Sequence, residues 1–276
     1  MSNEYTVDSL DVLAPSEAEP PPLDEQQRPP AVLGAKRAFA IFISFYLVEF
    51  LVAILAAIPL GVAAGIRAAD PGDASGGSHA LLESPVMVAM TLVATVFGGF
   101  VALRMARRTL PGSIGSGALS TIGWSRASKS QLTIAAAVGA TIALLYLVVL
   151  LRHFPPAPNR TAGPFASAIR SGGWPLHIWA LLAIVSAPIE EFVHRGVLFS
   201  GLSRSWGTLW SGLFVTVVFV LGHLFEIRTY WPALLSVTLA ATAFLILRIK
   251  MKSFMPSVIC HAAYNAVIAA AVYVTT

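Results

Sequence analysis

Cysteine is almost absent from this sequence, whose one thiol is at Cys260. A single cysteine excludes an intramolecular disulfide and a cysteine-based zinc cluster. Charge is also scarce, because Asp, Glu, Lys and Arg make up 12% of the chain, whereas a soluble globular domain carries about a quarter. With 56% hydrophobic residues and a mean hydropathy of +0.74, the composition excludes an ordinary soluble enzyme and indicates an integral membrane protein. In so apolar a chain the basic pI of 9.5 does not indicate a nucleic-acid partner.

The N-terminal residues differ in chemistry from the rest of the chain. Residues 1–35 hold seven acids and one base, a net charge of −6, whereas residues 36–276 hold 17 bases and seven acids, a net charge of +10. Prolines cluster in the same stretch, at 20–22 and 29–30. Low hydrophobicity with clustered proline predicts a disordered acidic arm over residues 1–35. The start of the chain shows no basic segment followed by an apolar run, so no signal peptide is expected.

The remaining sequence contains long apolar runs, and a helix needs about 20 such residues to cross a bilayer. Only helices and closed barrels span membranes, and the alternating pattern of a barrel is absent. We therefore predict an all-α fold, a polytopic transmembrane helix bundle. Its spans, about seven, are expected at roughly 38–66, 84–103, 131–151, 175–201, 207–226, 232–248 and 255–274.

Lysine and arginine counts predict the orientation of these spans, because cytoplasmic loops carry the excess of basic residues. Twelve bases fall on one side of the predicted topology and five on the other. The richer side includes the N-terminus, which is therefore expected to be cytoplasmic. The Ala-, Gly- and Val-rich spans are typical of a bacterial plasma membrane protein.

Ionisable groups inside a bilayer are costly, so each is a functional hypothesis. After Glu83 the only carboxylates are Glu190, Glu191 and Glu226. Arg195 is four residues after Glu191 and shares its helix face, so this pair can neutralise itself. Glu190 points about 100° away around the helix and has no cation nearby in the sequence. It is therefore the candidate general base.

Two further patterns lie on later spans. Phe219 precedes His223 by one helical turn, so its ring could pack against the imidazole. His261 precedes Asn265 by the same four residues. Each pattern alone has a structural reading, as a salt bridge between helices or an interhelical hydrogen bond. His194, inside the glutamate motif, serves either the reaction or helix packing. The joint presence of all three patterns on three spans favours chemistry.

Together these patterns resemble the CPBP family of intramembrane proteases, which includes the type II CAAX prenyl endopeptidases and bacteriocin-processing relatives. The resemblance covers about residues 175–275 and divides the chain into the arm, N-terminal transmembrane helices over 36–174 and a catalytic core over 175–276. One departure is His194, because the family usually has an aromatic residue before the arginine.

The resemblance implies an intramembrane endopeptidase that cleaves a membrane-associated protein or peptide with water activated by Glu190. It further implies that His223 and Asn265 stabilise the oxyanion and that His261 positions the water or the carbonyl. Glu191 and Arg195 would then hold the helix geometry. No prosthetic cofactor is needed for this chemistry.

Alternatives stay open at this stage. Two His and one or two Glu could hold Zn²⁺ at an open catalytic site, although their spacing is not a zinc signature. The same fold could also serve as a non-proteolytic scaffold or immunity-type protein, or as a small-solute transporter. On straight crossings Glu190 and His223 differ in depth by roughly 10 Å. Catalysis therefore requires a kink at Pro188, a tilted fifth span or a widened cavity.

Overall fold

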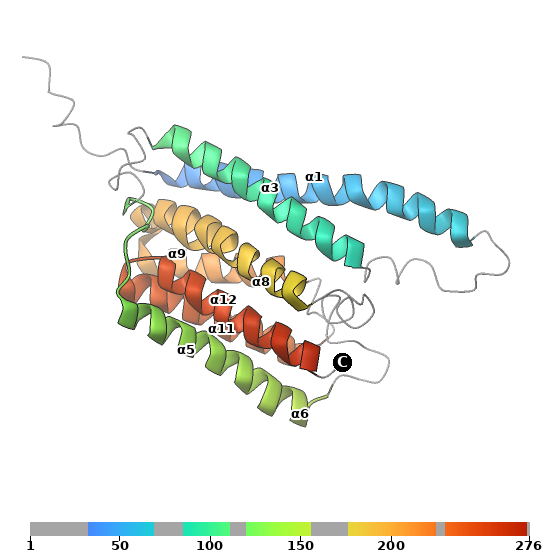
Figure 1. Ribbon diagram of the computed structural model, residues 1–276. Helices are drawn as coiled ribbons and strands as arrows, with labels where there is room; N and C mark the ends of the chain where they lie inside the picture. The colour runs from blue at the N-terminus through green and yellow to red at the C-terminus, as the bar shows by residue number, and fades with distance from the viewer. Residues whose placement is uncertain (1–32, 69–84, 111–119, 156–175, 225–229, 275–276) are drawn as a thin grey trace, which may run out of the picture. The chain divides into compact units, whose positions relative to one another are not determined.

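The apolar runs form helices in the computed structural model, which describes residues 33–68, 85–110, 120–155, 176–224 and 230–274 (Figure 1). The predicted acidic arm lies outside these ranges except for its last residues. Of these, Leu33 is buried in the core and Ala35 begins the first helix. All described residues belong to one compact unit that extends over residues 31–276.

Helices make up the regular structure of these ranges, and no strand occurs in them, which confirms the all-α prediction. Short π-helical segments, named η, interrupt two of the longer helices. The elements are α1 (Ala35–Ala68), α3 (Pro85–Thr109), α5 (Lys129–Leu145), η2 (Tyr146–Leu150), α6 (Leu151–His153), α8 (Leu176–Glu191), η3 (Phe192–Leu198), α9 (Phe199–Gly222), α11 (Trp231–Met251) and α12 (Met255–Val274).

Five helical stretches of the described chain are long and apolar enough to cross a membrane. They are Ala35–Pro59, Ala89–Thr109, Lys129–His153, Ile184–Gly222 and Trp231–Met251, and a shorter apolar helix covers Met255–Ala271. The protein is therefore an integral membrane protein. The stretch Ile184–Gly222 contains most of two predicted spans, because the chain turns within it.

Gly207 makes this turn inside α9. Its φ of 74° and ψ of 167° form a backbone conformation that glycine adopts at little cost. The helix continues beyond residue 201, where the apolar pattern predicted its end, and reverses only at this glycine. The rings of His194 and Phe219, 13 residues before and 12 residues after Gly207, lie with centroids 5.2 Å apart. The two halves are therefore antiparallel neighbours, and Gly207 sets their register.

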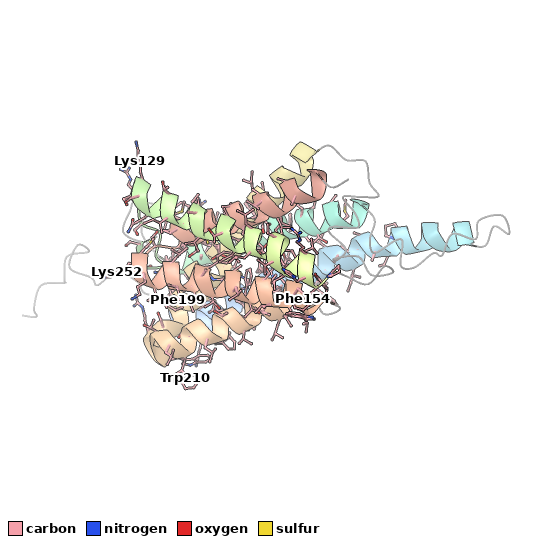
Figure 2. All side chains as sticks on the ribbon, turned by 90° about the horizontal axis from the view of Figure 1, so that it is seen from below. Lys129, Phe154, Phe199, Trp210 and Lys252 are labelled. Carbon is pink, nitrogen blue, oxygen red and sulfur yellow. The ribbon has the colours of Figure 1, made fainter. Side chains whose placement is uncertain are left out.

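One end of the helical unit gathers most of the described basic residues. There Leu33 before α1, Ala106 near the end of α3 and Phe254 before α12 share one buried cluster. Figure 2 shows Lys129 and Lys252 at this end and Phe154 at the other. The bases of this basic end are Lys36, Arg37, Arg104, Arg107, Arg108, Arg126, Lys129, Arg204, Arg248, Lys250 and Lys252.

Small residues allow the helices around α12 and α9 to approach closely. A Cβ atom at Gly139 of α5 would overlap the carbonyl oxygen of Cys260 on α12. A Cβ atom at Gly201 would overlap the side chain of Ala38 on α1. Close backbone approach of this kind supplies packing energy in lipid, where no hydrophobic effect draws helices together. It holds the helices that carry the three motifs against α1 and α5.

Candidate active site

The double glutamate lies where an α-helix changes into a π-helix. α8 ends at Glu191, three residues after Pro188, and η3 follows with all seven residues buried. A π-helical turn is rare and frequently occurs at functional sites, because it displaces side chains from regular helical register. At this junction Glu191 is fully buried, whereas the side chain of Glu190 is 18% exposed.

Glu191 is the centre of a buried ionic cluster. Its Oε1 accepts hydrogen bonds from Arg195 Nη1 at 3.0 Å and from His261 Nδ1 at 3.1 Å. The Arg195 guanidinium carbon lies 4.3 Å from the centroid of the Phe219 ring and 5.4 Å from that of Phe244. These five residues, called the Glu191 cluster below, join α8, η3, α9, α11 and α12.

Backbone groups complete the cluster. Arg195 Nη2 donates to the carbonyl oxygen of Ala241 at 3.1 Å. Arg248 of α11 in turn donates from Nε to the carbonyl oxygen of Arg195 at 3.1 Å and from Nη2 to Ser200 Oγ at 3.1 Å. These contacts pair the buried charges of the cluster, as burial requires, and let it support the surrounding helices. Glu191 Oε2 and Arg195 Nε find no hydrogen-bond partner among the described residues.

Glu190 faces the other way and meets His223, the C-cap residue of α9. Its Oε2 lies 3.8 Å from His223 Nε2, which is too long for a direct hydrogen bond. Among the described residues no donor is within hydrogen-bonding distance of this buried oxygen. The His223 side chain is 29% exposed, and its Nδ1 donates to the carbonyl oxygen of Phe219 at 2.9 Å. We call Glu190 and His223 the Glu190 pair.

The register set by Gly207 explains why this pair is close. Glu190 precedes Gly207 by 17 residues (207 − 190), and His223 follows it by 16 (223 − 207). Antiparallel helices place residues equidistant from their turn at the same level. The expected depth difference of roughly 10 Å is therefore wrong, because it assumed a helix end at residue 201.

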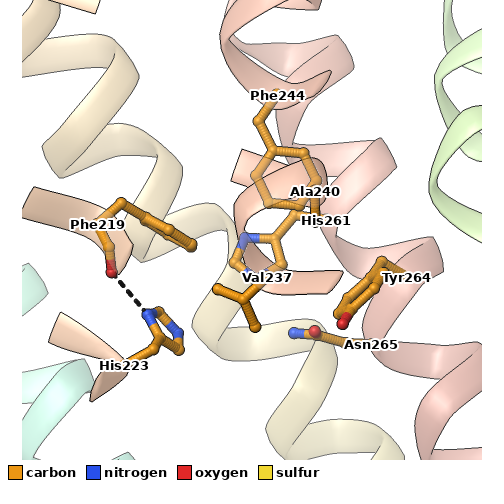
Figure 3. A pocket seen from close by; sticks show the side chains of 8 residues that line it. All are labelled: Phe219, His223, Val237, Ala240, Phe244, His261, Tyr264 and Asn265. Atoms are coloured by element: carbon orange, nitrogen blue, oxygen red, sulfur yellow. Dashed lines mark hydrogen bonds between the residues drawn. The ribbon is translucent and has the colours of Figure 1, made fainter. Parts of the chain in front are cut away.

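A cavity of about 40 Å³, measured as the volume open to the centre of a water molecule, is lined by His223 of the pair, whereas Glu190 is not one of its lining residues. This is enough space for water, because one water needs roughly 10 to 15 Å³ on this measure. In Figure 3, His223 stands on one side, and Asn265 directs its amide group into the cavity from the other. The lining residues are Phe219, His223, Val237, Ala240, Phe244, His261, Tyr264 and Asn265.

The structure thus brings the predicted residues of all three motifs into one region. His261 lines the cavity and is held from two sides, by Glu191 through Nδ1 and by the Phe244 ring, which stacks on it with centroids 4.7 Å apart. Since Nδ1–H donates to the carboxylate, Nε2 is the ring nitrogen left to act on the cavity. Asn265 lines the same cavity from the next turn of α12.

Sequence reasoning missed Tyr46 of α1 and took Glu49, on the same span, for a helix-packing or cavity group. The hydroxyl of Tyr46 lies 3.0 Å from His194 Nε2. One turn later, Glu49 accepts a 2.6 Å hydrogen bond from Thr95 of α3 and is within electrostatic reach of Glu190. A tyrosine and a carboxylate three residues apart on an apolar span share one helix face. That spacing is the sequence signal for them.

The donor atoms do not converge on one point where a metal could bind. Glu190 pairs with His223 and Glu191 with His261, and Glu191 Oε1 is already engaged by Arg195. In the part of the chain that the structure describes, no group of three or more His, Cys, Asp or Glu side chains is placed to hold a metal ion. The residues present therefore do not fit a zinc centre of the usual three-ligand kind.

Comparison with known families supports an endopeptidase. Residues 172–267, that is 96 of the 276 residues, match the family described as type II CAAX prenyl endopeptidase Rce1-like. The match includes α8, η3, α9, α11 and most of α12, and it confirms the resemblance noted from the three motifs. No curated protein and no solved structure matches the chain.

Proposed function

We propose that this chain, a membrane protein whose residues 172–267 are of the Rce1-like type II CAAX prenyl endopeptidase family, hydrolyses peptide bonds with a water activated by Glu190. The observation that carries this proposal is the Glu190 pair. A carboxylate oxygen with no hydrogen-bond donor among the described residues faces an imidazole nitrogen at 3.8 Å, and that histidine lines a cavity large enough for water.

The geometry of the pair suits a water molecule. Because His223 Nδ1–H donates to the Phe219 carbonyl, Nε2 of the neutral ring is an acceptor, as is Glu190 Oε2. A water about 2.8 Å from both atoms can donate one hydrogen to each. As the water oxygen attacks the substrate carbonyl carbon, Glu190 takes the proton and the carbonyl oxygen becomes the oxyanion.

The opposite wall of the cavity supplies donors for that oxyanion. We assign this role to Asn265, through its side-chain NH₂. His261 lines the same cavity and is held by Glu191 through Nδ1, so we assign it the positioning of the water or the carbonyl. This division differs from the one implied by the resemblance, which gave the oxyanion to His223 and Asn265. The contact between His223 and Glu190 supports the change.

Collapse of the tetrahedral intermediate completes the reaction. The carbon–nitrogen bond breaks, the proton held by Glu190 passes to the leaving amine, and Glu190 returns to the carboxylate form. Preorganised donors matter most in such a water-poor site, where each is worth about 3 to 4 kcal/mol of transition-state stabilisation. No step in this scheme requires a prosthetic group.

The substrate we propose is a membrane-associated protein or peptide, reached from the bilayer. A prenylated C-terminal peptide is the first chemical class to test, because the matching family carries that name. A membrane peptide without a prenyl group is the second. We further propose a bacterial plasma membrane location with the basic end, and hence the N-terminus, in the cytoplasm, since basic residues concentrate on cytoplasmic faces.

The test compares protein termini in membranes from cells that carry wild-type protein or Glu190→Ala at matched abundance. We expect new N- or C-termini with wild type only, and the cut site then supplies a peptide for kinetic work. Tyr230→Phe is the matched control, because it removes a buried tyrosine hydrogen bond to Phe154 away from the site. Identical termini in all cells would exclude proteolysis and favour a non-enzymatic scaffold.

A further inference from the structure

The N-terminal helix α1, which lies outside the family-matched residues 172–267, contacts the backbone of the general base through two hydrogen bonds in series. The Tyr46 hydroxyl lies 3.0 Å from His194 Nε2. His194 Nδ1 lies 2.8 Å from the carbonyl oxygen of Glu190. The second bond fixes the direction of the first, because a carbonyl only accepts. His194 therefore carries its proton on Nδ1 and accepts from Tyr46 at Nε2.

Aromatic rings hold the His194 imidazole on several sides. It is 1% exposed, and its ring centroid lies 5.5 Å from that of Phe42, 6.0 Å from Tyr46 and 5.2 Å from Phe219, all in edge-to-face arrangements. A ring in such a cage has little freedom to turn. The hydrogen bonds from Tyr46 to His194 and from His194 to the Glu190 carbonyl therefore link α1 to the end of α8 with little freedom of movement.

The Glu190 carbonyl that accepts this hydrogen bond lies where the α-helix changes into a π-helix. Glu190 is two residues after Pro188 and two residues before the π-helical segment that begins at Phe192. Backbone carbonyls change partners at such a junction, so an added donor at the Glu190 carbonyl limits its movement. The direction of the Glu190 carboxylate, and its 3.8 Å separation from His223, follow from that backbone.

We propose that Tyr46 and His194 form a positioning pair that holds Glu190 in line with His223, so that α1 is a required part of the active site. The proposal rests on the proposed endopeptidase function. Tyr46 contacts His194, and His194 contacts the Glu190 carbonyl oxygen, so we assign both an action through the Glu190 backbone and not on the substrate.

A double-mutant cycle on the full-length protein separates positioning from packing. Tyr46→Phe and His194→Phe each leave one polar group unpaired in an apolar cage, and each is expected to lower the unfolding temperature. The double variant Tyr46→Phe/His194→Phe removes both polar groups and keeps the aromatic packing, so its unfolding temperature should return close to that of wild type. Its kcat on the peptide found by terminal profiling should still fall roughly 10- to 100-fold, with KM little changed.

The controls distinguish failure of this proposal from failure of the proposed function. Tyr230→Phe should keep the wild-type kcat. Wild-type kcat in the double variant, with activity lost in Glu190→Gln, would reduce the pair to packing and overturn the proposal. Undiminished cleavage by Glu190→Gln would instead overturn the proposed function.

A second measurement needs no substrate. Replacing the single native thiol by Cys260→Ala provides a background for Glu190→Cys/His223→Cys, which a short bifunctional thiol reagent can link across the cavity. Adding Tyr46→Phe/His194→Phe should lower the cross-linking yield, because the Glu190 turn is no longer held. An unchanged yield would show that the pair does not set this geometry.

Discussion

Glu190 and Glu191 are neighbours in the sequence, yet they lie in opposite environments. Glu191 is fully buried, and its Oε1 accepts from Arg195 and His261. Glu190 is partly exposed, and among the described residues its Oε2 has no hydrogen-bond donor and lies 3.8 Å from the His223 nitrogen. Glu191 thus belongs to a fully buried ionic cluster, although its Oε2 finds no hydrogen-bond partner among the described residues, whereas Glu190 forms a looser pair with a histidine that lines the cavity.

The difference in environment indicates that one glutamate has a structural role and the other a catalytic role. A carboxylate whose oxygen is engaged by two cations or donors is a poor proton acceptor but a good anchor for helices. A carboxylate with an unused lone pair near water can accept a proton during the reaction. The Glu191 cluster therefore supports the fold, and the Glu190 pair is left to perform the chemistry.

Replacing each glutamate by glutamine should give the largest effects and should separate the two roles, one through kcat and the other through the unfolding temperature. Glu190→Gln removes the proton acceptor, so we expect kcat to fall by about 10²- to 10⁴-fold with the unfolding temperature unchanged. Glu191→Gln weakens the support, so we expect a lower unfolding temperature in detergent. Kinetics and thermal unfolding of both variants check the contrast. The opposite outcome, activity lost without destabilisation in Glu191→Gln only, would reverse the two assignments.

Arg195→Met tests the support from its cationic side. The variant leaves Glu191 buried without its closest cation, which should lower the free energy of unfolding by about 3 to 5 kcal/mol. Chemical denaturation in detergent measures this change. The double variant Glu191→Gln/Arg195→Met should regain most of the loss, because it removes both charges together. A single variant as stable as wild type would show that the cluster contributes little.

Asn265→Ala tests whether the wall opposite the Glu190 pair stabilises the oxyanion. Loss of one such donor should lower kcat by about 10²- to 10³-fold, with a smaller effect on KM. Asn265→Asp serves as the comparison, since it keeps the size but replaces the NH₂ donors by a negative charge. Its kcat should be at least as low as that of Asn265→Ala. An aspartate variant with wild-type kcat would remove Asn265 from this role.

Chelation is expected to have the smallest effect. Because the two glutamate–histidine pairs do not share a point where a metal could bind, treatment of the purified protein with a zinc chelator should leave kcat unchanged. The assay follows the same peptide before and after dialysis. A loss of activity that added Zn²⁺ restores would contradict the metal-free scheme and would indicate that both glutamates bind one metal ion.

The helical motif spacings were sufficient to identify several contacts before any fold was known. Glu191 and Arg195 pair across one turn, as their i, i+4 spacing predicts. Other contacts cross between helices and leave no local pattern. Arg195 and Ala241 are 46 positions apart, and Tyr46 and His194 are 148 positions apart, and no sequence pattern links the members of either pair. Periodicity reports which face a residue shares, and not which helix covers that face.

Composition, apolar run length and residue spacing by themselves determined that this is a helical membrane protein with charged groups on particular helix faces, because the bilayer tolerates few other arrangements. The tertiary structure decided which residues lie at the same depth in the helix bundle and which side chains contact one another. The reversal at Gly207 brings Glu190 level with His223, and the π-helical segment after Glu191 buries one glutamate beside its arginine. These relations depend on one backbone conformation and on helix packing, which a linear pattern does not encode.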